Sequence, residues 1–132
     1  MKVLLTAALA AWAISGGVAL ADGDAASGEK VFGKCKSCHA IGEGAKNKVG
    51  PQLNGIVGRP WGEDGTFKYS PALKELAPGK VWDDATLDAY LKKPKDVIPR
   101  GRMAFPGLRR SEQRADVIAY LKQFNADGSK AE

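Results

Sequence analysis

Residues 35–39 read Cys-Lys-Ser-Cys-His, which is the C-x-x-C-H spacing of a c-type haem attachment site. In such a site two thiols add to the two vinyl groups of one porphyrin, and the adjacent histidine reaches the iron from the same side. The chain contains no cysteines besides Cys35 and Cys38, and no histidine besides His39. The motif therefore predicts one covalently attached haem c, with His39 as an axial ligand of the iron.

The second axial ligand is sought among the methionines, of which the chain has two. Met1 belongs to the amino-terminal segment that is predicted below to be a signal peptide, so Met103 is the candidate. Met103 lies in a loop that is stiffened by Pro99 and Pro106 and in which Gly101 permits a sharp turn. The alternative interpretation, a flexible core filler, is weaker in a proline-rich loop downstream of a haem motif. A thioether favours Fe(II) and raises the reduction potential, and two protein ligands leave no open coordination position. The pair therefore predicts outer-sphere electron transfer rather than catalysis.

Three other kinds of site compete for the same residues. A C-x-x-C pair can be a thiol–disulfide redox centre, but that interpretation leaves His39 unexplained and no βαβ pattern surrounds the motif. A zinc site needs four ligands, and the chain has three Cys and His residues in all. A haem sensor or peroxidase with an open iron site is the remaining alternative, and it requires that Met103 does not bind the iron.

The amino-terminal segment has the pattern of a signal peptide. Lys2 supplies a positive charge, residues 3–14 are apolar with one exception, and residues 19–21 (Ala-Leu-Ala) give a small-x-small cleavage pattern. The apolar run is short for a bilayer, which needs about 20 residues; an uncleaved anchor is the alternative. We therefore expect residues 1–21 to be removed, residues 22–132 to form one small domain, and the protein to be periplasmic.

The balance of charge is basic, with a net charge of +5 and a pI near 9.3. In an exported protein this charge favours acidic protein partners or a membrane surface. Nucleic acid is not expected as a partner, because the cations are dispersed among acidic residues rather than gathered in runs.

The pattern of apolar residues predicts an all-α protein with long connections, since no repeat and no strand-like alternation is present. Helices are expected over residues 25–34 after Asp24, over 71–77 after Ser70, from Asp83 or Asp84 to a stop at Pro94, and from Ser111 to about Phe124. Residues 40–69 and 94–110 are expected to be loops, the first of them wrapped around a cofactor that replaces part of the core. The polar tail from Gly128 onward is expected to fray.

Together these motifs resemble the class I c-type cytochromes, specifically the bacterial cytochrome c2 group related to mitochondrial cytochrome c. The resemblance covers residues 28–122. It implies a class I cytochrome c fold, with four to five short helices around one covalently bound haem. It also implies that Gly28 permits close crossing of the first and last helices.

The resemblance implies roles for residues around the haem. The carbonyl of Pro51 would accept a hydrogen bond from the second ring nitrogen of His39 and fix its orientation. Arg59 would lie near the haem propionates. The O–H of Tyr69 and the N–H of Trp82 would donate hydrogen bonds to them.

On the other side of the haem, the resemblance places Tyr90 beside the methionine sulfur and makes Phe105 a shield for the haem edge. One position departs from the family, which often has a threonine two residues before the methionine, bonded to a propionate. Here that residue is Gly101. We therefore expect a looser methionine loop and a lower barrier to loss of the Met103 ligand at high pH.

The resemblance further implies that cations around the exposed haem edge steer docking onto acidic partners. The matching positions are Lys34, Lys48, Lys95, Arg102, Arg109 and Arg110. The expected function is that of a monomeric single-electron carrier without enzyme activity, between a bc1-type complex and a terminal oxidase or photosynthetic reaction centre. A dedicated electron acceptor of a periplasmic dehydrogenase is an alternative that the sequence does not separate from it.

Overall fold

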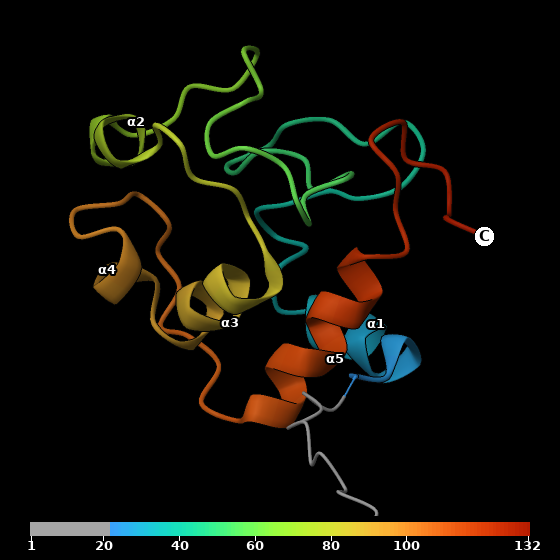
Figure 1. Cartoon of the computed structure of the whole chain (residues 1–132). Coiled ribbons are helices and arrows are strands. Elements are labelled where there is room, and N and C mark those ends of the chain that lie inside the picture. The colour runs from blue at the N-terminus through green and yellow to red at the C-terminus, as the bar shows by residue number, and fades with distance from the viewer. Residues whose placement is uncertain (1–21) are drawn as a thin grey trace, which may run out of the picture.

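The computed structural model describes residues 22–132, so the predicted signal peptide lies outside the described residues. This part of the chain folds into five helices joined by long loops (Figure 1). They are α1 (Ala25–Phe32), α2 (Pro71–Leu76), α3 (Asp84–Lys92), α4 (Pro94–Val97) and α5 (Ser111–Leu121). Within residues 22–132 extended pairing is limited to two isolated bridges, Pro60 with Val81 and Phe124 with Lys130. The expected all-α architecture is confirmed.

The start of α1 is fixed by Asp24, as predicted. Its carboxylate accepts hydrogen bonds from the backbone N–H groups of Ala26 and Ser27, at 2.9 and 3.4 Å, which satisfies two donors that a helix start leaves free. The helix ends at Phe32 rather than at the predicted residue 34. The chain continues in turns, so the Cys-x-x-Cys-His segment follows directly after α1.

The first and last helices cross at Gly28. A Cβ built on Gly28 would lie 1.9 Å from the backbone oxygen of Asp116 and 2.8 Å from Cβ of Tyr120, so only glycine allows this approach. The ring of Phe32 packs on Tyr120 at 5.4 Å, and the backbone N–H of Asp24 donates to the Asp116 carboxylate at 2.8 Å. The first and last helices thereby meet, and α1 and α5 lie against each other in Figure 1.

Helices α2 and α3 begin as the cap residues predict. The Ser70 hydroxyl accepts a hydrogen bond from the N–H of Leu73 at 3.1 Å. At the start of α3, it is Asp83 that accepts from the N–H of Thr86, at 2.8 Å, and Asp84 is the first helical residue.

Two expectations for the second half of the chain were wrong. Residues 94–110 do not form a continuous loop, because Pro94 opens the short helix α4; its fixed φ suits a first helical position, where no N–H is needed. At α5, Arg110 occupies the cap position without a side-chain hydrogen bond, Ser111 is already helical, and the helix ends at Leu121 instead of Phe124.

The expected fraying of the tail from Gly128 is not observed. Gly128 is buried, and a Cβ there would lie 2.3 Å from the backbone oxygen of Gly42. The N–H of Ala131 donates to the Gln123 oxygen at 2.6 Å, and Asn125 bonds to Ser129. The tail therefore folds back on the end of α5, because a glycine at φ +87° allows the reversal.

The core fills the space between the helices and the loops. Its buried members include Phe32, Trp82, Ile98 and Val117, and Trp61 stacks on Trp82 with ring centroids 4.4 Å apart. No helix within residues 22–132 has the length and hydropathy needed to cross a bilayer.

Candidate functional site

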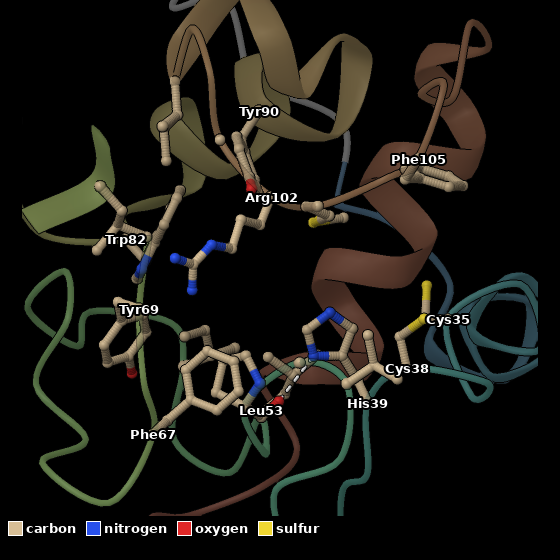
Figure 2. Close-up of a pocket in the computed structure, with 18 of the residues that line it drawn as sticks. Cys35, Cys38, His39, Leu53, Phe67, Tyr69, Trp82, Tyr90, Arg102 and Phe105 are labelled. Carbon is tan, nitrogen blue, oxygen red and sulfur yellow. Dashed lines mark hydrogen bonds between the residues drawn. The ribbon is translucent and has the colours of Figure 1, made fainter. Parts of the chain in front are cut away.

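A pocket of about 410 Å³ opens in the middle of the domain, within the size range of cofactor sites (Figure 2). Its lining brings together all of the predicted haem-site residues, which come from segments far apart in the sequence. They are Cys35, Cys38, His39, Pro51, Arg59, Tyr69, Trp82, Tyr90, Met103 and Phe105. The predicted axial ligands, His39 after α1 and Met103 in the loop before α5, therefore line one cavity.

The imidazole of His39 is held by a hydrogen bond between its Nδ1 and the carbonyl oxygen of Pro51, at 2.7 Å. With Nδ1 donating, Nε2 is the unprotonated nitrogen that can bind a metal. Burial lowers the pKa of His39, with a smaller opposing effect of the Pro51 hydrogen bond and a further lowering by the charge of Lys48. The ring is thus neutral near pH 7, which is the form that binds iron.

The glycine before Pro51 is a site residue to which the sequence analysis gave no role. A Cβ on Gly50 would lie 2.4 Å from Cε1 of His39 and within 2.9 Å of both ring nitrogens. The N–H of Gly50 also donates to the Cys38 oxygen at 2.8 Å, which joins this loop to the Cys-x-x-Cys segment. The imidazole therefore lies flat against bare backbone, and the Gly-Pro pair after the motif is the sequence signal for it.

The two thiols are free in the structure and half-buried at the pocket wall. Burial raises the pKa of the Cys35 thiol, assisted by nearby Cys38 and opposed by Lys34. Cys35 is therefore not held as an activated thiolate by a strong positive charge, which is the environment that a thiol redox centre needs.

Another part of the pocket wall is built around Trp82 and Arg59. Backbone hydrogen bonds from Gly58 N–H to the Trp82 oxygen, at 2.7 Å, and from Trp82 N–H to the Arg59 oxygen, at 2.9 Å, hold the two residues beside each other. The Arg59 guanidinium donates to the backbone oxygens of Asn54 and Gln52, at 3.0 and 3.1 Å. Its orientation along the pocket wall is therefore set by the loop itself.

Aromatic residues complete this wall. Tyr69 is buried, lies edge-on to Phe67 at 4.9 Å, and has its pKa raised by burial, with Arg59 opposing. Tyr90 packs on Trp82 at 4.9 Å, and burial raises the pKa of Tyr90 to about 12. Both phenols thus stay protonated at neutral pH and can act as hydrogen-bond donors.

The loop that carries Met103 begins with a tight turn. Ile98 is 2% exposed, and the N–H of Gly101 donates to its oxygen at 3.0 Å. The residue of this turn with positive φ is Arg100, at +65°, whereas Gly101 does not have a positive φ. Gly101 is instead tightly packed, because a Cβ there would lie 3.0 Å from the Ile98 oxygen. The looser loop expected from Gly101 stays a prediction.

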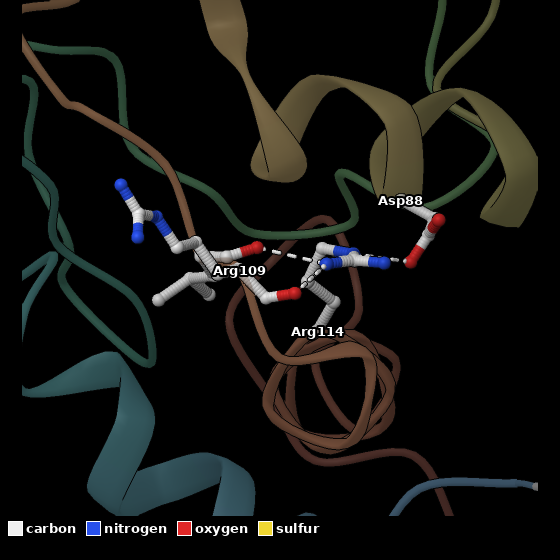
Figure 3. A network of polar contacts seen from close by, with 4 residues as sticks. Asp88, Arg109 and Arg114 are labelled. Carbon is white, nitrogen blue, oxygen red and sulfur yellow. Dashed lines mark hydrogen bonds and ion pairs between the residues drawn. The ribbon is translucent and has the colours of Figure 1, made fainter.

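The far end of the same loop is held by Arg114, which sequence reasoning missed (Figure 3). Its buried guanidinium donates to the backbone oxygens of Leu108 and Arg109, at 2.8 and 3.0 Å, and to the Asp88 carboxylate of α3, at 2.7 Å. The N–H of Leu108 also donates to the Leu91 oxygen at 2.7 Å. A cation one turn into a helix usually marks a solvated face, so the sequence contains no clear signal for this contact.

The six predicted docking cations are all exposed, but they differ in direction. Lys34 and Arg102 also line the pocket, and Figure 2 shows the Arg102 guanidinium inside it, on the side of Trp82 and Tyr90. Lys95 lines a shallow hollow beside Phe105. Lys48 donates to the Lys36 oxygen at 2.6 Å.

The composition of the lining fits a haem. Most of the pocket is apolar, both cysteines lie at its wall, and four cations line it: Lys34, Arg59, Lys68 and Arg102. No aspartate or glutamate of residues 22–132 lines it, so the charge is suited to a ligand that carries carboxylates. No group of three or more His, Cys, Asp or Glu residues in the described part of the chain could hold a metal ion alone.

Comparison with known proteins agrees with this site. A family model described as Cytochrome c matches residues 25–125. Over 130 residues the chain is 48% identical to cytochrome c-554 of Methylosinus trichosporium, covering 98% of this chain and 97% of that protein. It is 51% identical to cytochrome c2 of Blastochloris viridis over 107 residues, covering 81% of this chain and 83% of the relative. The structure of cytochrome cH from Methylobacterium extorquens superposes with a TM-score of 0.69 at 46% identity, covering 76% of this chain and 99% of that one.

Proposed function

Since this chain belongs to the cytochrome c family of electron carriers, which bind one haem c covalently, we propose that it is a periplasmic single-electron carrier. It takes electrons from a bc1-type complex and passes them to a terminal oxidase or a photosynthetic reaction centre. The mature protein is a monomer that begins near Asp22, after removal of the leader. Export is supported by the leader pattern of residues 1–21.

The observation that carries this proposal is the meeting of Cys35, Cys38, His39 and Met103 at one apolar pocket. Bound there, the haem supplies an iron that changes between Fe(II) and Fe(III). His39, oriented by Pro51, would hold the iron through Nε2, and Met103 is the candidate for a second ligand. With both ligands in place no position is left for a substrate, which favours electron transfer.

The chain's part in transfer is to bind a partner briefly at the pocket mouth. Lys34 is an exposed cation of the pocket lining, and Lys95 adjoins Phe105 at the hollow beside it. Arg109 and Arg110 are further exposed cations of the same predicted docking set. Such charges raise association rates with an acidic partner and are screened by salt. A small, polar interface of this kind separates quickly, as a shuttle requires.

The test uses the purified holoprotein and membranes from the source organism. We expect the oxidised protein to show the methionine-to-iron charge-transfer band, and quinol-driven membranes to reduce it and then reoxidise it. Exchanging Arg109 and Arg110 for glutamine should slow both reactions at low salt, whereas Lys74→Gln, on α2 and outside the docking set, should not. Absence of the band at neutral pH would favour an open-site sensor or peroxidase. Reduction only by a soluble periplasmic dehydrogenase would replace the bc1-type donor.

A further inference from the structure

Arg102 is the residue before the candidate ligand Met103, and its side chain turns inward rather than outward. It lines the pocket, and its guanidinium lies in the space between Trp82 and Tyr90 on one side and His39 on the other (Figure 2). None of the ion pairs formed within residues 22–132 involves Arg102. This direction is not the one that a docking cation needs.

Within the described part of the chain, the pocket lining contains four cations but no carboxylate that could pair with them. The Arg59 guanidinium is already oriented by two backbone oxygens, those of Asn54 and Gln52. Lys68 and Lys34 are exposed at the rim. Arg102 is exposed as well, but its guanidinium reaches into the pocket (Figure 2), where no carboxylate of the lining is available to it. A cation in an apolar pocket is stable only with a counter-charge or a hydrogen-bond acceptor.

The backbone around it explains why an arginine can take this direction. Arg100 adopts φ +65° and Gly101 packs tightly on Ile98, so the turn presents the next side chain to the cavity. Gly101 itself has no hydroxyl to offer, although the related proteins often have threonine at this position. The loop therefore lacks one neutral donor, and the donor next to Gly101 is the charged side chain of Arg102.

We propose that Arg102 is a positioning residue that pairs with a propionate of the haem, in place of the hydroxyl that Gly101 lacks. The inference rests on the haem of the proposed function, but not on which partners exchange electrons with it. A guanidinium can donate two parallel hydrogen bonds to one carboxylate, which a hydroxyl cannot. The pair would keep that propionate ionised and would join the methionine loop to the wall of Trp82 and Tyr69.

The test measures the midpoint potential of the purified holoprotein across pH, without any partner. In Arg102→Gln the potential should fall, because a positive charge near the iron is lost, and the pH at which a propionate titrates should rise by about one unit or more. Arg102→Lys should recover most of the shift in potential, since it keeps the charge. Arg102→Met provides a second neutral variant should glutamine impair haem attachment, and it is judged by the same shift.

Arg109→Gln is the matched control, because it removes an equal charge from a cation outside the pocket lining. Its potential and pH profile should equal those of the wild type, while its association with membranes slows at low salt. The proposal is overturned if the neutral variants at Arg102 keep the wild-type potential and pH profile and slow association as Arg109→Gln does. The potential is read without membranes, so this result is distinct from a failure to find the proposed donor or acceptor.

Discussion

Replacing Gly50 by alanine should disturb the iron ligand His39 directly. An ordinary contact of a Cβ lies at 3.4–4 Å, and the new methyl would lie 2.4 Å from Cε1 of the ring, about 1 Å too close. Neither the His39 ring nor the Gly50 backbone can move away easily. The ring is held at 2.7 Å from the Pro51 oxygen, and the Gly50 backbone is bonded to the Cys38 oxygen at 2.8 Å.

The magnitude follows from these two anchors. Overpacking of a well-filled site costs ~1–3 kcal/mol, and weakening one of the two hydrogen bonds adds ~1 kcal/mol. We expect Gly50→Ala to lower the free energy of unfolding by about 2–4 kcal/mol and the melting temperature by roughly 10 °C. The displaced imidazole should also weaken the bond to iron, so the haem spectrum should change along with the stability.

The assay compares thermal unfolding and the axial-ligand absorption bands of the oxidised holoprotein. Gly65→Ala is the matched control, since a Cβ there meets nothing within 4 Å and Gly65 has no positive φ. It should behave as the wild type in both measurements. If Gly50→Ala kept the wild-type melting temperature and spectrum, the packing of His39 against bare backbone would not be the reason for this glycine.

Three further outcomes can be measured by urea unfolding of the holoprotein. Gly28→Ala should lower the free energy of unfolding by more than about 3 kcal/mol or prevent folding, because its Cβ would overlap the backbone of α5. Gly33→Ala, at the exposed end of α1, should lower it by about 1 kcal/mol or less. Equal effects of the two variants would contradict the role of the helix crossing. Arg114→Met should lower the free energy of unfolding by ~2–4 kcal/mol, because the buried carbonyl of Leu108 and the part-buried carbonyl of Arg109 lose their donor. Lys122→Met, which breaks an exposed ion pair, should lower it by less than about 1 kcal/mol. Hydrogen bonds at the start of α3 lower the pKa of Asp83 below its usual 3.8, so its contribution to stability is present above that pH and is lost as pH falls through the lower folded value. The urea concentration at the unfolding midpoint should therefore fall as the pH is lowered from about 6 to about 3, and it should fall by less in Asp83→Asn. An identical fall in the variant would show that Asp83 does not cause the pH dependence.

The parts of the site that the sequence predicted well are those set by covalent chemistry. Attachment through Cys35 and Cys38 needs one spacing along the chain, and a single histidine leaves no choice of imidazole. Caps such as Asp24 and Ser70 were also predictable, because their hydrogen bonds are made within three residues. Interactions of this kind depend only on residues that are close together in the sequence.

What the sequence did not reveal depends on distant contacts. Pro94 was interpreted as a stop, but it also opens α4, and only the surrounding fold decides between the two. The inward direction of Arg102 follows from the turn at Arg100 and Gly101. The clamp of Arg114 on Leu108 depends on where α3 and α5 lie. Dispersed cations look alike in a sequence, whichever way their side chains turn.

The packing of α1 on α5 also bears on the order in which folding and haem attachment take place. Asp24 and Asp116, which are bonded to each other, are 92 residues apart, so this junction forms only when nearly the whole chain is present. Closing a loop of that length has an entropic cost, and distant contacts fold slowly. We expect residues 35–39 to stay accessible on a nascent, still open polypeptide until α5 arrives. We expect haem to be attached to the two thiols in this interval, before α5 packs on α1.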